Sequence, residues 1–144
     1  MSKKVLIVEA RFYEDMADAL AEGAAAVLDA AGVAYERVSV PGVLEVAVAI
    51  KYAAATNAYD AYDGYVALGV VIRGETTHYE IVCNESARAL MELGIKDMLS
   101  IGNGIQTVEN SDQAWARCKM SEKDKGGGAA KATLALMGLR DNWS

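Results

Sequence analysis

The chain contains 144 residues, of which 53% are hydrophobic, and its 20 acidic and 14 basic side chains give a formal net charge of −6. This length predicts one domain with a sizeable core, and the apolar fraction excludes an intrinsically disordered chain. The acidic balance argues against a general surface for nucleic acid or an anionic membrane. No apolar run approaches the ~18 residues of a membrane span. Cys83 and Cys118 lack a metal-binding spacing, so we expect reduced thiols in a cytoplasmic protein.

The first half of the chain predicts two strand–helix units. Residues 5–8 form a short, wholly apolar run that is typical of a parallel strand buried on both faces. Over residues 14–31, apolar side chains recur every three or four positions, which predicts an amphipathic helix that ends at Gly32. Residues 35–40 predict a second strand, which Pro41 and Gly42 interrupt before a second helix over residues 44–55.

The second half repeats this alternation after a polar, tyrosine-containing linker. Its expected elements are a strand over residues 64–72, a helix from Tyr79 that ends at Gly94, a strand over 98–106, a short helix that contains Trp115 and Arg117, a charged loop over 119–128 and a last helix over 129–139. Basic side chains gather late in this half, at Arg117, Lys119, Lys123, Lys125 and Lys131. We interpret the lysines of the 119–128 loop as solvated charges and Trp115 as a packing residue.

Four short apolar strands that alternate with amphipathic helices predict an α/β fold. Because each crossover between parallel strands is right-handed and packs back on the sheet, the helices cover both of its faces. The sequence has no internal repeat, low-complexity tract or domain linker. We therefore expect one domain over residues 1–144, a three-layer α/β/α sandwich around a four-stranded parallel sheet.

Three predicted strand ends carry unusual residues. Phe12 and Tyr13 follow the first strand, residues 41–45 follow the second, and the polar run from Arg73 to His78 follows the third. Parallel topology brings these ends to one edge of the sheet, where ligands of open α/β sheets bind. His78 suits proton transfer near neutral pH, and the backbone amides before it suit a phosphate at a helix N-terminus. A solvated, helix-capping role for His78 stays open at this point.

Other motifs for chemistry are missing. The sequence contains no Walker loop, no dinucleotide-binding glycine fingerprint, no His-Glu-x-x-His metal helix and no paired Cys-x-x-Cys. The glycine-rich runs at residues 102–104 and 126–128 lack the flanking pattern of a nucleotide-binding loop, so we interpret them as turns. The strand-end cluster is therefore the leading candidate site.

Four motifs resemble those of the lumazine synthase family, in the same order and over nearly the whole chain. They are Val40-Pro-Gly-Val-Leu-Glu45, Ala67-Leu-Gly-Val-Val-Ile-Arg-Gly-Glu-Thr-Thr-His78, Gly104-Ile-Gln-Thr-Val-Glu-Asn110 and Gln113-Ala-Trp-Ala-Arg117. The resemblance implies a flavodoxin-like sandwich. It also implies a transferase of riboflavin biosynthesis that condenses 5-amino-6-(D-ribitylamino)uracil with 3,4-dihydroxy-2-butanone 4-phosphate, without metal or organic cofactor. Homo-pentamers, decamers or icosahedral 60-mers are the expected assemblies, with sites shared between subunits and no nucleic-acid or membrane partner.

The resemblance also implies a role for individual residues. His78 matches the proton-transfer residue, Phe12 the ring that stacks on the pyrimidine, and Arg117 the phosphate-binding arginine. Glu75 and Thr76 match the phosphate-side loop, and Asn103 and Lys125 match positions that the neighbouring subunit supplies. The remaining residues implied to line the substrate pocket are Val43, Leu44, Glu45, Val70, Val71 and Ile72.

Several departures from the family pattern define the alternatives. Leu44 replaces an aromatic residue of many members, Tyr13 stands where asparagine is common, and no proline follows Glu45 by two positions. Together with the alanine-rich first two helices, these departures are compatible with a lumazine-synthase-like shell or scaffold protein with weak or no catalysis. A flavodoxin-like module that binds a flavin is a third interpretation, which the lack of a phosphate loop after the first strand disfavours.

Overall fold

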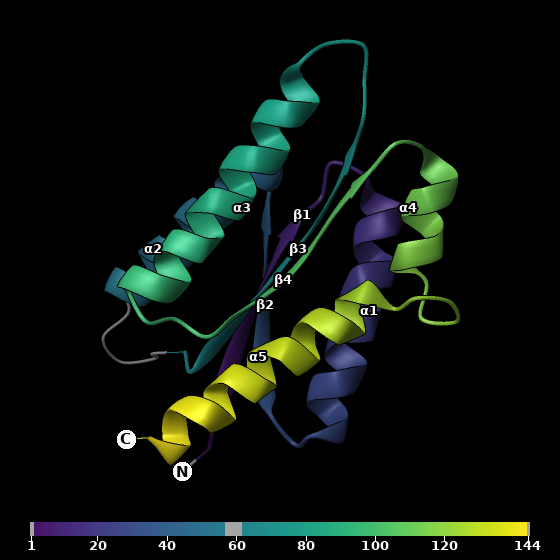
Figure 1. The fold of residues 1–144 in the computed structure, drawn as a ribbon. Helices are drawn as coiled ribbons and strands as arrows, with labels where there is room; N and C mark the ends of the chain where they lie inside the picture. Colours follow the sequence, from purple (N-terminus) through teal and green to yellow (C-terminus); the bar gives the residue numbers. More distant parts are fainter. Residues whose placement is uncertain (1, 57–61, 144) are drawn as a thin grey trace.

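Four parallel strands form the central sheet of the computed structural model, which describes residues 2–56 and 62–143 (Figure 1). The strands are β1 (Lys4–Ala10), β2 (Ala34–Val40), β3 (Gly64–Ile72) and β4 (Ile101–Val108). Their order across the sheet is β2-β1-β3-β4, with β1 and β3 in the middle. The predicted four-stranded parallel sheet is confirmed, although β4 begins and ends later than the predicted residues 98–106.

Helices cover both faces of this sheet. One layer consists of α1 (Glu14–Ala30), α4 (Ser111–Cys118) and α5 (Lys125–Asn142), and the other of α2 (Val46–Thr56) and α3 (His78–Lys96), as Figure 1 shows. A short 3-10 helix, η1 (Val43–Glu45), precedes α2, where the sequence had indicated one continuous helix. The three-layer α/β/α sandwich is therefore confirmed. Within the described residues, no helix has the length and apolar character needed to cross a bilayer.

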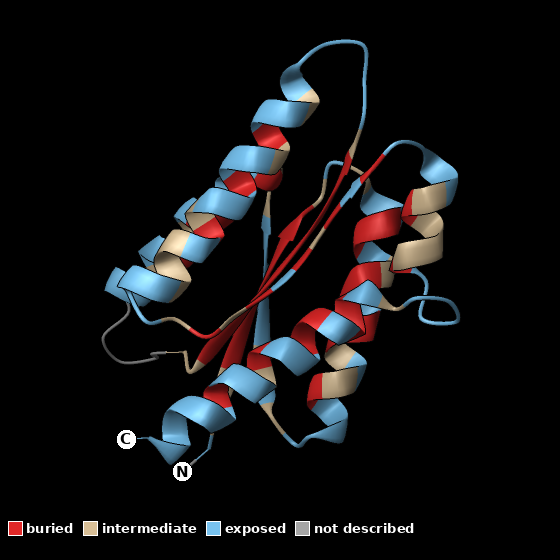
Figure 2. Cartoon of the chain, in the orientation of Figure 1, coloured by how far each residue is buried: buried red, intermediate tan, exposed pale blue. Residues whose placement is uncertain are grey.

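The two faces of the inner strands supply two separate cores (Figure 2). On β1, Val5 and Ile7 pack toward α1 and α5, whereas Leu6 and Val8 pack toward α2 and α3. This alternation follows from the two-residue period of a strand, and it explains why residues 5–8 of β1 are apolar on both faces. Complete burial of one such aliphatic side chain stabilises the fold by roughly 1.5–3 kcal/mol. The sheet interior is therefore a rigid platform for the strand ends.

The end of α3 differs from the prediction. Gly94 lies inside the helix, which continues to Lys96, and the Asp97 amide still donates a 3.1 Å hydrogen bond to the carbonyl of Leu93. The left-handed conformation that ends many helices is adopted two residues later by Met98, with φ of 59°. The Arg140 guanidinium donates a 2.5 Å hydrogen bond to the Met98 carbonyl, which holds this conformation. At the end of α1, by contrast, Gly32 takes φ of 68° as predicted.

The start of α5 also differs. Residues 125–128 were expected to be a loop, but α5 begins at Lys125 and its first turn contains the glycine run. Asp124 caps this turn by accepting a 3.2 Å hydrogen bond from the Gly127 amide. A Cβ atom on Gly126 would lie 2.0 Å from the carbonyl oxygen of Leu20 on α1. The glycines therefore allow two helices to approach closely, whereas the sequence alone had indicated a turn.

The strand order creates one crevice at the carboxyl edge of the sheet. The chain leaves β1 for β2 on one side and then crosses to β3 on the other side of β1. Helices before and after this reversal lie on opposite faces, so the carboxyl ends of β1 and β3 are not covered by a helix. The predicted linker over residues 56–63 lies largely outside the described residues.

Candidate active site

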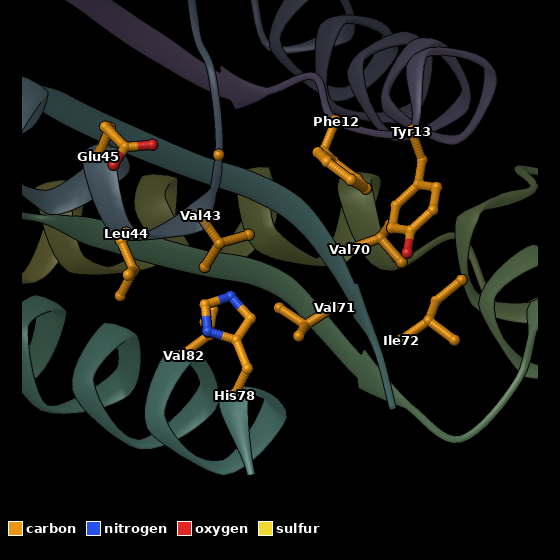
Figure 3. Close-up of a pocket in the computed structure, with 11 residues that line it drawn as sticks. Phe12, Tyr13, Val43, Leu44, Glu45, Val70, Val71, Ile72, His78 and Val82 are labelled. Atoms are coloured by element: carbon orange, nitrogen blue, oxygen red, sulfur yellow. The ribbon is translucent and has the colours of Figure 1, made fainter. Parts of the chain in front are cut away.

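A cavity of about 440 Å³ opens at the carboxyl ends of the inner strands (Figure 3). It is contributed by the segments after β1 and β2, the end of β3 and the first turns of α3. Its lining residues are Phe12, Tyr13, Gly42, Val43, Leu44, Glu45, Val70, Val71, Ile72, His78 and Val82. This volume falls within the usual range for small-molecule sites, roughly 300–1,000 Å³. The predicted convergence of three strand ends is confirmed.

An ion-pair network fixes the segment that carries the aromatic wall. Glu9, at the end of β1, is only 2% exposed, and its carboxylate accepts hydrogen bonds from Arg11 at 2.7 Å and from Arg37 of β2 at 2.5 and 3.0 Å. Arg11 also reaches Asp18 on α1 at 2.5 Å, and these carboxylates raise its pKa, the Asp18 bond most strongly. A buried carboxylate is tolerated only when it is paired in this way. The chain entering Phe12 is thus held to β1, β2 and α1.

The aromatic wall itself is open. Phe12 and Tyr13 make an edge-to-face contact, with ring centroids 4.9 Å apart and planes at 82°. Phe12 nevertheless remains 74% exposed, which is unusual for a phenylalanine in such a well-fixed segment. Its ring is therefore available to a ligand or to another chain. Figure 3 shows both rings on the side of the cavity opposite His78 and Leu44.

The second wall depends on a glycine in β3. Gly42 accepts a 3.2 Å hydrogen bond from the Glu45 amide, which closes the turn of η1. Val43 packs against β3 at Gly69, where a Cβ atom would approach the valine methyl group to 2.8 Å. Glycine at this position therefore allows η1 to lie directly on the strand. Leu44 and Glu45 then project from η1 at the cavity rim, both exposed.

His78 contributes the imidazole of the site. It is the first residue of α3, after the N-cap residue Thr77, and its amide donates a 3.3 Å hydrogen bond to the Thr76 hydroxyl. In Figure 3 the imidazole lies beside Val43 and Val82. The side chain that binds the His78 amide is thus that of Thr76, and the ring of His78 lines the cavity. Tyr13, Glu45 and His78 are the titratable groups among the described lining residues.

The structure brings together Phe12, His78 and all six residues that were predicted to line the substrate pocket. Glu75 and Thr76 lie in the exposed loop that leads into His78, outside the cavity lining. Asn103 is exposed on the edge strand β4, where its side chain accepts a 3.0 Å hydrogen bond from the Ile105 amide.

Two basic side chains that were predicted to bind substrate lie outside the cavity as well. Arg117 is half-buried on α4 and donates a 3.0 Å hydrogen bond to the carbonyl of Gln113, and Lys125 is exposed at the start of α5. Both helices belong to the α1 layer, whereas Asn103 is on the opposite face of β4, because its neighbours Gly102 and Gly104 face Ala129 of α5. One chain therefore does not place these three side chains around its own cavity.

Sequence reasoning placed Gly42 in the strand-end cluster but did not assign Val82 to the site. Val82 lies one helical turn after His78, so the four-residue spacing on α3 was the available signal. Gly42 belongs to a quoted motif, and its role follows from the turn that it closes. Cys83, the next residue on α3, is half-buried, and desolvation raises the pKa of its thiol. Among the described residues, no group of three or more His, Cys, Asp or Glu side chains is arranged to hold a metal ion.

Comparisons with known proteins agree on one family. The sequence profile described as 6,7-dimethyl-8-ribityllumazine synthase matches residues 2–141. A protein of that name from Agrobacterium fabrum is 59% identical over 143 residues, which cover 97% of each chain. Another from Sphingopyxis alaskensis is 57% identical over 139 residues, which cover 96% of each chain. A third, 6,7-dimethyl-8-ribityllumazine synthase 1 of Rhizobium meliloti, is 58% identical over 94% of this chain and 90% of its own. The chain therefore belongs to the 6,7-dimethyl-8-ribityllumazine synthase family.

Proposed function

We propose that this chain is a transferase of riboflavin biosynthesis that condenses 5-amino-6-(D-ribitylamino)uracil with 3,4-dihydroxy-2-butanone 4-phosphate to give 6,7-dimethyl-8-ribityllumazine. One observation carries the proposal: the single histidine of a chain in this family lines the cavity at the carboxyl edge of the sheet. No observation favours the scaffold or flavin-binding alternatives. The proposal covers residues 1–144 as one domain, in the cytoplasm.

The cavity provides a platform for the pyrimidine substrate. Phe12 presents an exposed ring on which a flat heterocycle stacks, and the apolar side chains of Val70 and Ile72 form the floor below it. The carboxylate of Glu45 at the rim is a hydrogen-bond acceptor for the polyhydroxylated ribityl chain. Because both reactants are intrinsically reactive, holding them in one orientation supplies much of the acceleration.

His78 moves the protons of the reaction. The substrate amine attacks the ketone carbon, and a proton must reach the departing hydroxyl as water leaves and the imine forms. Phosphate then leaves as a proton is removed from the adjacent carbon, and the second amine closes the ring with loss of water. An imidazole exchanges protons in both directions near neutral pH, and such assistance contributes roughly 10²–10⁴-fold to a rate.

The phosphate requires a cation that the cavity lacks. None of the described lining residues is a lysine or an arginine. Arg117 would bind a phosphate in bidentate fashion, but it lies on α4 in the other helical layer. We therefore infer a site completed by a second subunit, which supplies Asn103, Arg117 and Lys125 to the Glu75–Thr76 side of the cavity. A homo-pentamer, or a decamer or 60-mer built from pentamers, provides such an interface.

A direct assay tests this function. The purified protein is mixed with both substrates, and the absorbance of the lumazine product is followed against a buffer control. We expect product to form faster with protein, with saturation in both substrates. A rate equal to that of the buffer control, in a sample whose native mass shows an intact assembly, would refute the proposal.

A further inference from the structure

Arg73 is the charged residue of the β3–α3 connection that the proposed reaction does not use. It follows β3 directly, and its amide donates a 2.9 Å hydrogen bond to the Val108 carbonyl at the end of β4. Its Nε donates to Glu109 at 2.6 Å, and its Nη1 donates to Glu80 on α3 at 2.5 Å. The guanidinium also lies over the ring of Tyr79, 4.3 Å from the centroid. One side chain thus joins β3, β4 and α3.

These contacts favour the charged forms of Arg73 and Glu80. Glu109 and, next, Glu80 raise the pKa of Arg73 through their hydrogen bonds. The Arg73 hydrogen bond is the main cause that lowers the pKa of Glu80 below its ordinary value. The N–H groups on two edges of the guanidinium therefore bind carboxylates, and one face of the guanidinium stacks on an aromatic ring. In this state Arg73 is not an open anion site, so its role differs from that of a phosphate-binding arginine.

Arg73 and Glu80, two members of this cluster, flank His78 in the chain. Residues 74–77 connect Arg73 to His78, and all four are exposed. Glu80 lies in the first turn of α3, two residues after His78. The Arg73–Glu80 ion pair therefore joins the two ends of a loop that contains His78. If this ion pair is removed, the first turn of α3 loses a direct ionic link to the end of β3.

We propose that Arg73 is a positioning residue, which together with Glu80 and Glu109 fixes the first turn of α3 and thereby the imidazole of His78 relative to the cavity. This inference rests on the proposed function of His78. Ion pairs between exposed side chains contribute little to global stability, so the cluster acts on geometry. Displacement of a reacting group by about 1 Å is enough to slow a reaction up to 10²-fold.

The chain offers a matched control on the same helix. Arg88 is also exposed and also binds two glutamates, Glu85 and Glu92, each at 2.9 Å. All three of these residues belong to α3, so this cluster does not join separate elements. Arg73→Gln and Arg88→Gln therefore remove the same charge and the same number of carboxylate partners. Only the first substitution breaks a link between α3 and the sheet.

The first test reads the position of His78 without the reaction. Because the sequence contains one histidine, a ¹³C-histidine label reports on His78 alone in the intact assembly. We expect Arg73→Gln to shift or broaden its imidazole signal and to accelerate amide exchange in residues 78–83. Arg88→Gln leaves both unchanged. If the two variants are indistinguishable from wild type in both measurements, Arg73 does not position His78 and the inference is overturned, whatever the activity of the protein.

The second test reads the reaction. We expect Arg73→Gln to lower kcat about tenfold with KM values for both substrates within about twofold of wild type. In a His78→Ala background, the same substitution has almost no further effect, because it acts through the imidazole. An equal loss in both backgrounds would overturn the positioning role. A wild-type protein that forms no product refutes the proposed function instead, and the histidine signal then still decides whether Arg73 orients the ring.

Discussion

His78 and Arg117 are the two side chains on which the proposed chemistry depends most. We expect His78→Ala to lower kcat by about 10²-fold while the KM values change little, because proton transfer is lost and the binding surface stays. Steady-state kinetics under saturation with each substrate in turn measures both parameters. His78→Gln, which keeps a hydrogen-bonding group of similar size, is the control. If it retains full activity, proton transfer by the imidazole is not required.

Arg117 is expected to act on the phosphorylated substrate alone. Arg117→Ala raises the KM for the butanone phosphate by at least about tenfold, since a charge-assisted bidentate contact to phosphate contributes roughly 1.5–3 kcal/mol. The KM for the pyrimidine stays near the wild-type value. Titration of each substrate with the other at saturation separates the two effects. Equal changes in both KM values would contradict a phosphate-binding role.

Cys118 provides a test of the core next to α4. The thiol is fully buried, and burial raises its pKa from an ordinary value of 9.0 to about 11. In the unfolded chain the thiol ionises at lower pH, so the folded state is relatively destabilised as pH rises from 9 toward 11, by about 2–3 kcal/mol. Denaturant titrations at pH 8 and pH 11 measure this loss. We expect the loss to shrink in Cys118→Ala, and an unchanged loss would contradict burial of the thiol.

At the residue scale, the sequence predicted which side chains converge, because parallel topology determines where strand ends meet. Phe12 and Val43 were placed at the site on that ground and Ile72 by the family resemblance, and all three line the cavity. The ion pairs of Arg73 were not predictable, since they depend on how the ends of β4 and α3 are rotated toward β3. Backbone periodicity carries no information about that rotation.

Among the elements, α5 shows most clearly that a run of glycines can lie in a helix as well as in a turn. Its first-turn glycines were interpreted as a turn, and local propensity does disfavour glycine in a helix. Tertiary packing overrides this preference where α5 meets α1 and β4: a Cβ atom on Gly102 would lie 1.9 Å from the Ala129 carbonyl. The end of α3 is the reverse case, in which Met98 adopts the conformation expected of a glycine.

Packing between α1 and α5 leads to a paired prediction. Gly126→Ala is expected to destabilise the protein by at least about 2 kcal/mol, because its Cβ atom would overlap the Leu20 carbonyl. Gly138→Ala, in the same helix, meets no atom within 4 Å and is expected to stabilise it by roughly 0.5–1 kcal/mol. Thermal or denaturant unfolding of the two variants under one set of conditions compares them. Equal effects of the two substitutions would contradict the close approach of the helices.

At the scale of the whole molecule, the outer helices expose many large apolar side chains to solvent. On the outer surface of α2 and α3 these are Val48, Tyr52, Ile81, Met91 and Ile95. Side chains of this kind on neighbouring helices mark contacts with other chains. We expect native mass spectrometry to show five subunits or a multiple of five. A monomer at micromolar concentration would contradict the shared site.

The separate locations of His78 and Arg117 have a consequence for assemblies that mix two variant chains. If each cavity takes its phosphate-binding arginine from a neighbour, a chain with His78→Ala and a chain with Arg117→Ala are each slow when alone at a butanone phosphate concentration below its KM. After the two chains are unfolded together and reassembled, some interfaces pair an intact histidine with an intact arginine, and activity returns. The recovered activity should rise with the fraction of mixed interfaces. Two defects within a self-contained site would show no such complementation, whatever the mixing ratio.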